Sequence, residues 1–518
     1  MTVPARSSAR LCHLVAARAA HAWRALAIAG CLALAGCASA PVSVPASAAI
    51  DRVSLFPMTD YDQNVDRWIA PDSPDYDRPF LSAADQQAHL LALYARYFGT
   101  AAHDPSPWNS AYVDARVYRQ LGSDIVALQQ RRIERFDNTR QTGRRIGYGQ
   151  NFRPHTKAWI DAIAQNMNVG QFENAPSFQP GRRAIATGNL MVRELPTMDP
   201  SFYSRHLAGE GYPFDNLQIS AIRPGTPLYV LGSSLDGGWD YVQTPDVQGW
   251  VRSRGVAAVD DAFADAWRTA ARQALGAVIV ASAPVRDTQG MFRFDAPAGT
   301  LLPVLAATAP GQRTAMVPVR DVDGRAVIRT ALLNDAQIVP MPWRATPRHL
   351  ATLLKALIGR PYGWGNTGLY NDCSSELQSI FAAFGVWLPR HSSSQMSAGD
   401  MTDLSGDSPA QRLAVLMREG KPMRTLIYIG GHVMLYLGNV QHGGHLVPLV
   451  YQDIWGLSPA DNSRRAVIGG SVITPLLLNI PEDPALRSLA ATPTFRISII
   501  GTAGVGASVP ADDDDPAS

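Results

Sequence analysis

The chain has 518 residues, enough for about three or four domains, and its 46% hydrophobic and 17% charged residues are ordinary for a globular protein. Its formal charge of +2 becomes −2 once four arginines near the N-terminus are removed. The net charge therefore gives no indication of a nucleic acid partner. Three of its four cysteines lie within the first 37 residues, which leaves no pair for a structural disulfide in the remainder.

The first 36 residues (1–36) have the pattern of an export signal peptide. Four arginines and no acidic residue precede an apolar run that is shorter than the roughly 20 residues needed to span a bilayer. The run ends in Leu-Ala-Gly before Cys37, which resembles the lipobox of bacterial lipoproteins, although Cys31 follows a similar Ile-Ala-Gly. We therefore predict a lipid anchor on Cys37. Ala38, and not an aspartate, follows Cys37, which by resemblance to Gram-negative sorting signals implies the periplasmic side of the outer membrane. An ordinary secreted protein cleaved nearby is the alternative.

The next segments change from helical to strand patterns. Small residues and prolines at 37–50 predict a tether, and apolar residues at helical spacing over 51–178 predict a mainly helical domain. Short alternating strands separated by turns over 179–262 predict a small β-barrel. A second set of such strands over 263–342 predicts another barrel.

Residues 343–500 return to mixed helix and strand and hold Cys373, while the tail at 501–518, with four consecutive aspartates, is predicted to be disordered. Cys373 precedes apolar residues on one predicted helical face, namely Leu377, Ile380, Phe381 and Phe384. A thiol that begins a helix is favoured as thiolate by the helix macrodipole and by free backbone N–H groups. The pattern predicts a nucleophile, although a buried free cysteine is also a common small hydrophobic residue.

A cysteine nucleophile needs a base, and His432 is the candidate because it begins an apolar strand after two glycines. A glycine-rich turn and a second apolar strand follow, which predicts an antiparallel hairpin centred near His442. That centre places Gln452 opposite His432, close enough for its amide oxygen to hold one imidazole tautomer. A bulge in the turn would bring Asp453 there instead, so Asp453 remains the alternative. His445 lies too far along the hairpin.

Five ordered motifs then define a resemblance. They are Gly359–Gly365 (Gly-Arg-Pro-Tyr-Gly-Trp-Gly), Asp372–Ser375, Leu388–Ser392, Gly431–Val433 and Tyr451–Gly456. Together they resemble the NlpC/P60 family of cell-wall cysteine peptidases. The two predicted barrels are similar to bacterial SH3 domains, and the helical segment before them is similar to the clip-like domain that accompanies them. The resemblance implies a multidomain α+β protein with a papain-like catalytic domain.

The resemblance also implies an activity and its residues. Relatives of this kind are γ-D-glutamyl to L-diamino acid endopeptidases on murein peptides such as L-Ala-γ-D-Glu-diaminopimelate, with a preference for a free N-terminal L-alanine. The implied catalytic residues are Cys373, His432 and Gln452, where the family often has a histidine at the third position. No cofactor or metal is expected.

The implied substrate contacts lie around the cysteine. They are Asp372 for the alanine ammonium, Ser374 and Ser392 for the glutamyl pocket, Tyr362 for the cleft wall, and Glu210 of the first barrel for a second ammonium contact. A helix N-cap is a nearly equal interpretation of Asp372. Two other functions stay open: a lipid-anchored murein-binding protein without activity, and a cysteine amidase or acyltransferase of the same superfamily.

Overall fold

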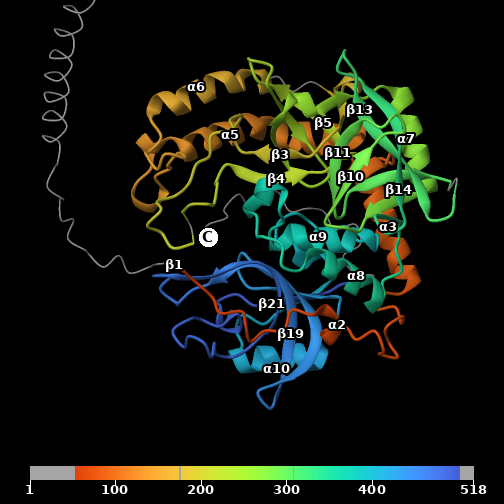
Figure 1. Ribbon diagram of the computed structural model, residues 1–518. Coiled ribbons are helices and arrows are strands. Elements are labelled where there is room, and N and C mark those ends of the chain that lie inside the picture. The colour runs from red at the N-terminus through yellow and green to blue at the C-terminus, as the bar shows by residue number, and fades with distance from the viewer. Residues whose placement is uncertain (1–52, 174–176, 210, 307–308, 502–518) are drawn as a thin grey trace, which may run out of the picture. The chain divides into compact units, whose positions relative to one another are not determined.

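The computed structural model describes residues 53–173, 177–209, 211–306 and 309–501, without the side chains of 119–124 (Figure 1). The predicted leader, the lipidation site at Cys37, the tether and the acidic tail lie outside these residues, and so does Glu210. Within the described ranges, no helix is long and apolar enough to cross a membrane.

The N-terminal region is mainly helical, as its apolar spacing predicts. Its helices are α2 (Val65–Trp68), α3 (Ala83–Phe98), α4 (Ser110–Tyr112), α5 (Arg119–Phe136) and α6 (Lys157–Met167). Side chains cap the longer ones: Ser82 accepts from the backbone N–H of Asp85 at the start of α3, and Thr156 accepts from that of Trp159 at the start of α6. These helices pack in two separate cores. Leu93 and Phe98 of α3 belong to the core shared with the C-terminal domain, whereas Ile160 and Met167 of α6 pack on the first barrel.

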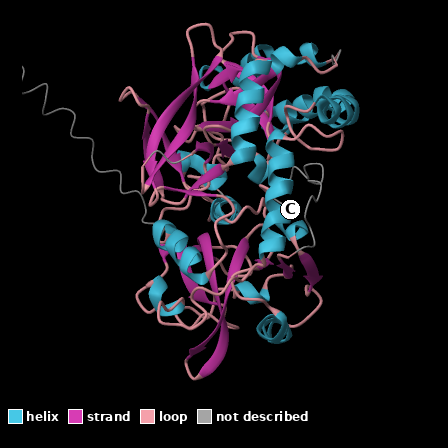
Figure 2. Ribbon diagram, turned by 90° about the vertical axis from the view of Figure 1, so that its right-hand side faces the viewer, coloured by secondary structure: helices cyan, strands magenta, loops and turns pink. Residues whose placement is uncertain are grey.

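Two groups of short antiparallel strands follow, as predicted, and Figure 2 shows them apart from the C-terminal sheet. The first barrel contains β2 (Arg183–Ala186), β3 (Leu190–Arg193), β4 (Gln218–Ile222), β5 (Pro227–Ser233), β6 (Trp239–Gln243), β7 (Gln248–Arg252) and β8 (Val256–Ala258). The linking helix α7 (Asp261–Gln273) leads to the second. That barrel contains β9 (Leu275–Val278), β10 (Ser282–Arg286), β11 (Phe292–Pro297), β12 (Leu301–Leu305), β13 (Gln312–Arg320), β14 (Ala326–Asn334) and β15 (Ile338–Pro340).

The C-terminal domain is a mixed sheet with helices on both faces (Figure 1). Its helices are α8 (Pro347–Leu357), α9 (Cys373–Ala383) and α10 (Pro409–Glu419), and its strands are β16 (Asp400–Asp403), β17 (Thr425–Tyr428), β18 (Val433–His442), β19 (His445–Leu457), β20 (Arg465–Pro475) and β21 (Arg496–Ile499). With β1 (Val53–Leu55) at one edge, the strand order is β1-β20-β19-β18-β17-β21-β16. Leu435 and Tyr451 face the core that contains α8 and α9, and Tyr436 and Val450 face the core that contains α10.

The first strand of this sheet comes from the other end of the described chain. β1 (Val53–Leu55) pairs in parallel with Arg465–Val467 of β20. The Gln63 side chain continues the attachment, because its amide donates to the carbonyl of Ile473 and accepts from the Ile473 N–H. The segment predicted to be helical therefore begins as an edge strand of the C-terminal sheet.

Candidate active site

Cys373 is the first residue of α9, as the helical spacing predicts. Asp372 is the N-cap: its side chain accepts from the N–H of Ser375, and the Ser375 hydroxyl accepts from the N–H of Asp372, which completes a capping box. The thiol is free and buried, with 6% of the residue exposed. A hydrogen bond from the backbone of Val433 reaches the thiol, so Cys373 lies beside the residue that follows His432.

The thiol of Cys373 is held in its neutral form. Burial and, to a smaller extent, the Asp372 carboxylate together raise its pKa to about 12, and the hydrogen bond from Val433 only partly opposes these effects. The expectation that the helix N-terminus favours a thiolate is therefore wrong for the resting protein. Desolvation and an adjacent negative charge outweigh the helix dipole.

His432 is partly buried, and its tautomer follows from a chain of hydrogen bonds. Its Nε2 lies 2.8 Å from Oε1 of Gln452, and Nε2 of Gln452 donates to Oγ1 of Thr474 at 2.8 Å. Because the Gln452 amide donates to Thr474, its oxygen faces the imidazole and accepts from Nε2–H. This leaves Nδ1 of His432 as the basic nitrogen. Burial lowers the pKa of His432 to about 4, so the ring is neutral at pH 7.

The hairpin register differs from the predicted one. His442 pairs directly with His445, so the turn is Gly443-Gly444 and its centre lies beyond His442. A bulge between Tyr436 and Gly438 then shifts the pairing of the two strands. Because Leu435 pairs with Tyr451, the same register places Gln452 opposite Met434. His432 lies two residues before Met434, and such diagonal neighbours remain within reach of a long side chain. The predicted contact between His432 and Gln452 is confirmed, but it arises from a diagonal and not from a direct pair.

We expect Gln452→Ala to lower kcat of a reaction that uses the Cys373 thiol by about a hundredfold, the size typical of a lost supporting group, because the imidazole loses the bond that fixes its tautomer. His445→Ala is the control, since His445 is exposed at the hairpin turn and should leave kcat unchanged. Steady-state kinetics on the two purified variants checks this. A larger loss in His445→Ala than in Gln452→Ala would contradict the assignment.

A neutral resting thiol has a consequence for chemical labelling. We expect iodoacetamide to alkylate Cys373 at pH 7.5 at least about tenfold more slowly than glutathione, because a pKa of about 12 leaves far less thiolate than an ordinary thiol has. The rate should rise with pH throughout the range from 7 to about 10. A protein that starts after Cys37 has Cys373 as its single cysteine, so mass spectrometry follows this site alone. Fast labelling with a plateau at pH 6 would show a thiolate instead.

The Asp372 carboxylate forms an ion pair with an arginine of the same chain. Arg390 binds it with two nitrogens, Nη2 to Oδ2 at 2.6 Å and Nη1 to Oδ1 at 3.1 Å, and both side chains are buried. Burial would raise the pKa of Asp372, but the Arg390 guanidinium and the hydrogen bonds from Ser375 hold it below the usual value. The N-cap interpretation of Asp372 is thus confirmed. Its carboxylate is already balanced by an arginine, which the sequence interpretation did not consider.

Arg390 also joins the first barrel to the start of α9. Its Nε donates to Oγ of Ser220 on β4 at 2.8 Å, Nη2 donates to Oδ1 of Asn366, and Nη1 donates to Oγ of Ser374 at 2.7 Å. Ser374, predicted to line the glutamyl pocket, is buried and also donates to Asp372. Ser392 lies two residues after Arg390 and is partly buried. The motif Leu388–Ser392 contained this arginine, but its partners lie in segments that only the fold brings together.

Aromatic rings from three segments meet beside the cysteine. Phe214, from the first barrel region, lies 5.1 Å from Trp455, 5.5 Å from Trp364 and 6.4 Å from Tyr362 between ring centroids. Burial and the nearby Cys373 and Asp372 raise the pKa of Tyr362, which places its hydroxyl within electrostatic range of the thiol. Tyr362 was predicted for the cleft wall, whereas Phe214 and Trp455 were missed as its neighbours.

A second buried carboxylate lies near the thiol. Asp453 is 1% exposed, and neither of its side-chain oxygens has a hydrogen-bond partner within the described part of the chain. Burial raises its pKa, and the charges of Glu376 and Asp372 raise it further, so Asp453 is held neutral at rest. Once ionised, Asp453 raises the pKa of Cys373 in turn. Asp453 does not orient His432, because that position is occupied by Gln452.

Comparison with known families agrees with this fold. Residues 200–252 match an SH3 domain of SH3b1 type, residues 260–309 match an SH3 domain of SH3b2 type, and residues 359–447 match the NlpC/P60 family. The chain is a multidomain α+β protein with the fold of a cell-wall peptidase. It carries an NlpC/P60 domain behind two SH3 domains.

Two solved structures are similar to this chain to different extents. The chain is similar to an NlpC/P60 endopeptidase from Photobacterium damselae subsp. piscicida, with 26% sequence identity, coverage of 87% of this chain and 99% of that one, and a TM-score of 0.74. An NlpC/P60 family protein from Bacillus cereus is 16% identical, and the match, with a TM-score of 0.39, covers 59% of this chain and 98% of that protein. No curated protein matches the chain at a significant level.

Proposed function

We propose that the protein is a cysteine endopeptidase that hydrolyses the γ-D-glutamyl to L-diamino acid bond of murein peptides. The observation that carries the proposal is the placement of Cys373 at the start of α9, beside the backbone of Val433, with the neighbouring His432 fixed by Gln452. A binding protein without activity has no need for a buried thiol next to an imidazole of fixed tautomer.

The chemistry follows from the resting protonation states. Nδ1 of His432 accepts the thiol proton as Sγ of Cys373 attacks the glutamyl carbonyl, so the ion pair forms only during the reaction. The backbone N–H of Cys373 at the helix start donates to the developing oxyanion. The imidazolium then protonates the leaving amine of the diamino acid, and a water molecule deprotonated by the same nitrogen hydrolyses the thioester.

Negative charge around the thiol supports a substrate with a free amine. The Asp372 carboxylate raises the pKa of Cys373, and Asp453, which is neutral at rest, raises it too once ionised, whereas Arg390 lowers it. A substrate ammonium in this region would favour the ionised form of Asp453. The Asp453 carboxylate would then bind the ammonium, whereas the Asp372 carboxylate is already bound by Arg390. Glu210 remains a proposed second contact from the first SH3 domain, and Ser374 and Ser392 remain proposed for the glutamyl pocket.

The experiment compares two tripeptides, L-Ala-γ-D-Glu-diaminopimelate and the same peptide acetylated on the alanine nitrogen. We expect cleavage at the γ-glutamyl bond, with kcat/KM about ten- to a hundredfold lower for the acetylated peptide, the effect of one charged hydrogen bond. Liquid chromatography with mass detection follows both. Binding without cleavage would favour a murein-binding protein, and transfer of the acyl group to an added amine in preference to water would favour an acyltransferase.

The cellular setting is proposed from the sequence alone. A lipid on Cys37 and the short tether at 37–50 would hold the enzyme at the periplasmic side of the outer membrane, within reach of murein peptides. Labelling with a radioactive fatty acid, with Cys37→Ser and Cys31→Ser compared, identifies the modified cysteine; label retained in Cys37→Ser would move the site to Cys31.

A further inference from the structure

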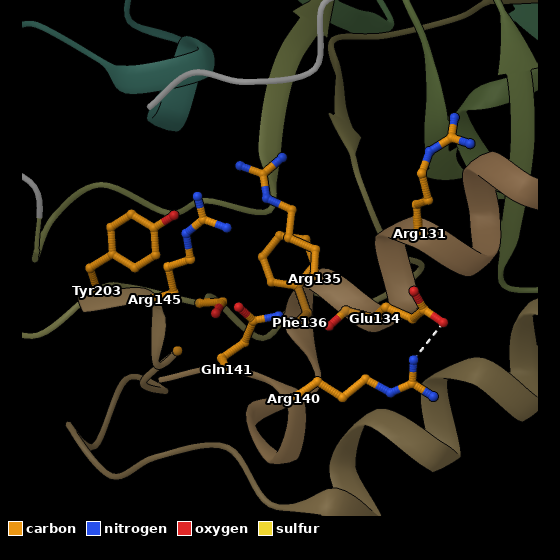
Figure 3. Close-up of a pocket in the computed structure, with 10 residues that line it drawn as sticks. Arg131, Glu134, Arg135, Phe136, Arg140, Gln141, Arg145 and Tyr203 are labelled. Carbon is orange, nitrogen blue, oxygen red and sulfur yellow. Dashed lines mark hydrogen bonds and ion pairs between the residues drawn. The ribbon is translucent and has the colours of Figure 1, made fainter. Parts of the chain in front are cut away.

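A pocket in the N-terminal region is lined by arginines and lies apart from Cys373. Its volume is about 460 Å³, and its walls are the end of α5, the loop that follows it up to Gly147, and the segment that holds Ser201 and Tyr203. Four arginines line it: Arg131, Arg135, Arg140 and Arg145. Glu134 is the single carboxylate in the lining, and Oε1 of Glu134 lies 2.6 Å from Nη1 of Arg140 (Figure 3).

Helix stability does not explain this collection of positive charge. A cation in the last turn of a helix interacts favourably with the macrodipole, which accounts for Arg135. Arg131 stands one turn earlier on the same face, and two like charges four residues apart destabilise a helix. Arg145 comes from the loop and lines the same pocket, so two segments of backbone, α5 and the loop after it, place guanidinium groups around one space.

The remaining lining consists mostly of hydrogen-bonding groups. Figure 3 shows the guanidinium groups of Arg135 and Arg145 and the Tyr203 hydroxyl turned toward the same part of the pocket, with the Gln141 amide nearby. Phe136 is the one large side chain in the lining without a polar group. The pocket therefore suits a polar anion and not a hydrocarbon chain, and its volume falls within the range of sites for small molecules.

We propose that this pocket binds a phosphate monoester. A planar guanidinium donates two parallel hydrogen bonds to phosphate, and a dianion balances a lining with three more arginines than carboxylates better than one carboxylate does. Such a group occurs on soluble phosphorylated metabolites and on the headgroup of phosphatidic acid. The lining offers one large apolar side chain, Phe136, to an acyl chain, which favours the soluble source. This inference is independent of the proposed peptidase activity.

The test titrates the full chain with inorganic pyrophosphate, as a soluble probe for the phosphate group, by calorimetry at low ionic strength. We expect saturable binding that Arg131→Glu and Arg145→Glu each weaken at least tenfold. Both residues are exposed, so these variants should fold normally, and their peptidase activity should match that of the unchanged protein. Arg153→Glu is the control, because Arg153 is exposed, does not line the pocket and gives the same change in net charge.

Arg140→Ala is a second control within the pocket, since this arginine already contacts Glu134, and it should weaken binding less than the other two. Several results would overturn the proposal: no saturable binding, equal weakening by Arg153→Glu, or acetate binding as tightly as pyrophosphate at the same ionic strength. Binding to vesicles of phosphatidylcholine with phosphatidic acid but not to pyrophosphate would also overturn it, in favour of a membrane headgroup.

Discussion

Cys373→Ala should abolish peptide hydrolysis, with kcat lowered by about a millionfold, the size of the loss when the nucleophile of a catalytic triad is removed. The thiol is the single nucleophile that the proposed reaction uses, and it touches the backbone beside His432. The purified variant is assayed with L-Ala-γ-D-Glu-diaminopimelate, and product is measured by chromatography over hours to detect residual turnover.

The same substitution should leave the fold intact. Cys373 is buried but small, and alanine is well suited to a helix, so the free energy of unfolding should fall by no more than about 1 kcal/mol. Thermal unfolding followed by circular dichroism provides this control. A folded Cys373→Ala protein that cleaves the peptide at the original rate would remove Cys373 from the mechanism and leave the NlpC/P60 domain without the proposed chemistry.

Local patterns were enough to predict the positions of the main elements. The spacing of Leu377, Ile380 and Phe381 after Cys373 predicted α9, and the aspartate before it was identified as a possible N-cap. Such features depend on neighbours within about four residues, so the sequence contains all the necessary information. The alternating strands of the two SH3 domains are equally local.

Errors arose where contacts join distant segments. β1 has three residues, too few to show an alternating pattern, and its partner Arg465 lies more than 400 positions later. Gln452 was matched to His432 through a turn centred near His442, whereas the turn is Gly443-Gly444, and a bulge that composition alone cannot place shifts the register again beyond it. The predicted contact survived because residues two apart share one face of a strand.

The electrostatics of the site could not be derived from residue types. A helix N-terminus favours a thiolate, yet burial of Cys373 and the nearby carboxylates reverse that preference. Burial is a property of the whole fold. Nor could residue types show that Asp372, predicted as a contact for a substrate ammonium, has a buried partner in Arg390, 18 positions along the chain.

Arg390→Met should lower the free energy of unfolding by about 3 to 5 kcal/mol, because it leaves the Asp372 carboxylate buried without a countercharge. Methionine has a similar length and no charge, so the loss reflects the missing guanidinium more than an empty space. Urea unfolding followed by fluorescence measures the change. Activity should fall as well, since Arg390 holds Ser374 and the start of α9 on which Cys373 lies.

The double variant Asp372→Asn, Arg390→Met separates two causes of that loss. Asparagine still caps a helix, and replacing both members of a buried ion pair by neutral groups is often nearly neutral for stability. We therefore expect the double variant to recover at least about half of the lost free energy. A double variant as unstable as Arg390→Met alone would mean that the unbalanced carboxylate is not the cause. The instability would then come from the lost bonds to Ser220 and Asn366, and Arg390 would serve mainly to fasten the first SH3 domain to the NlpC/P60 domain.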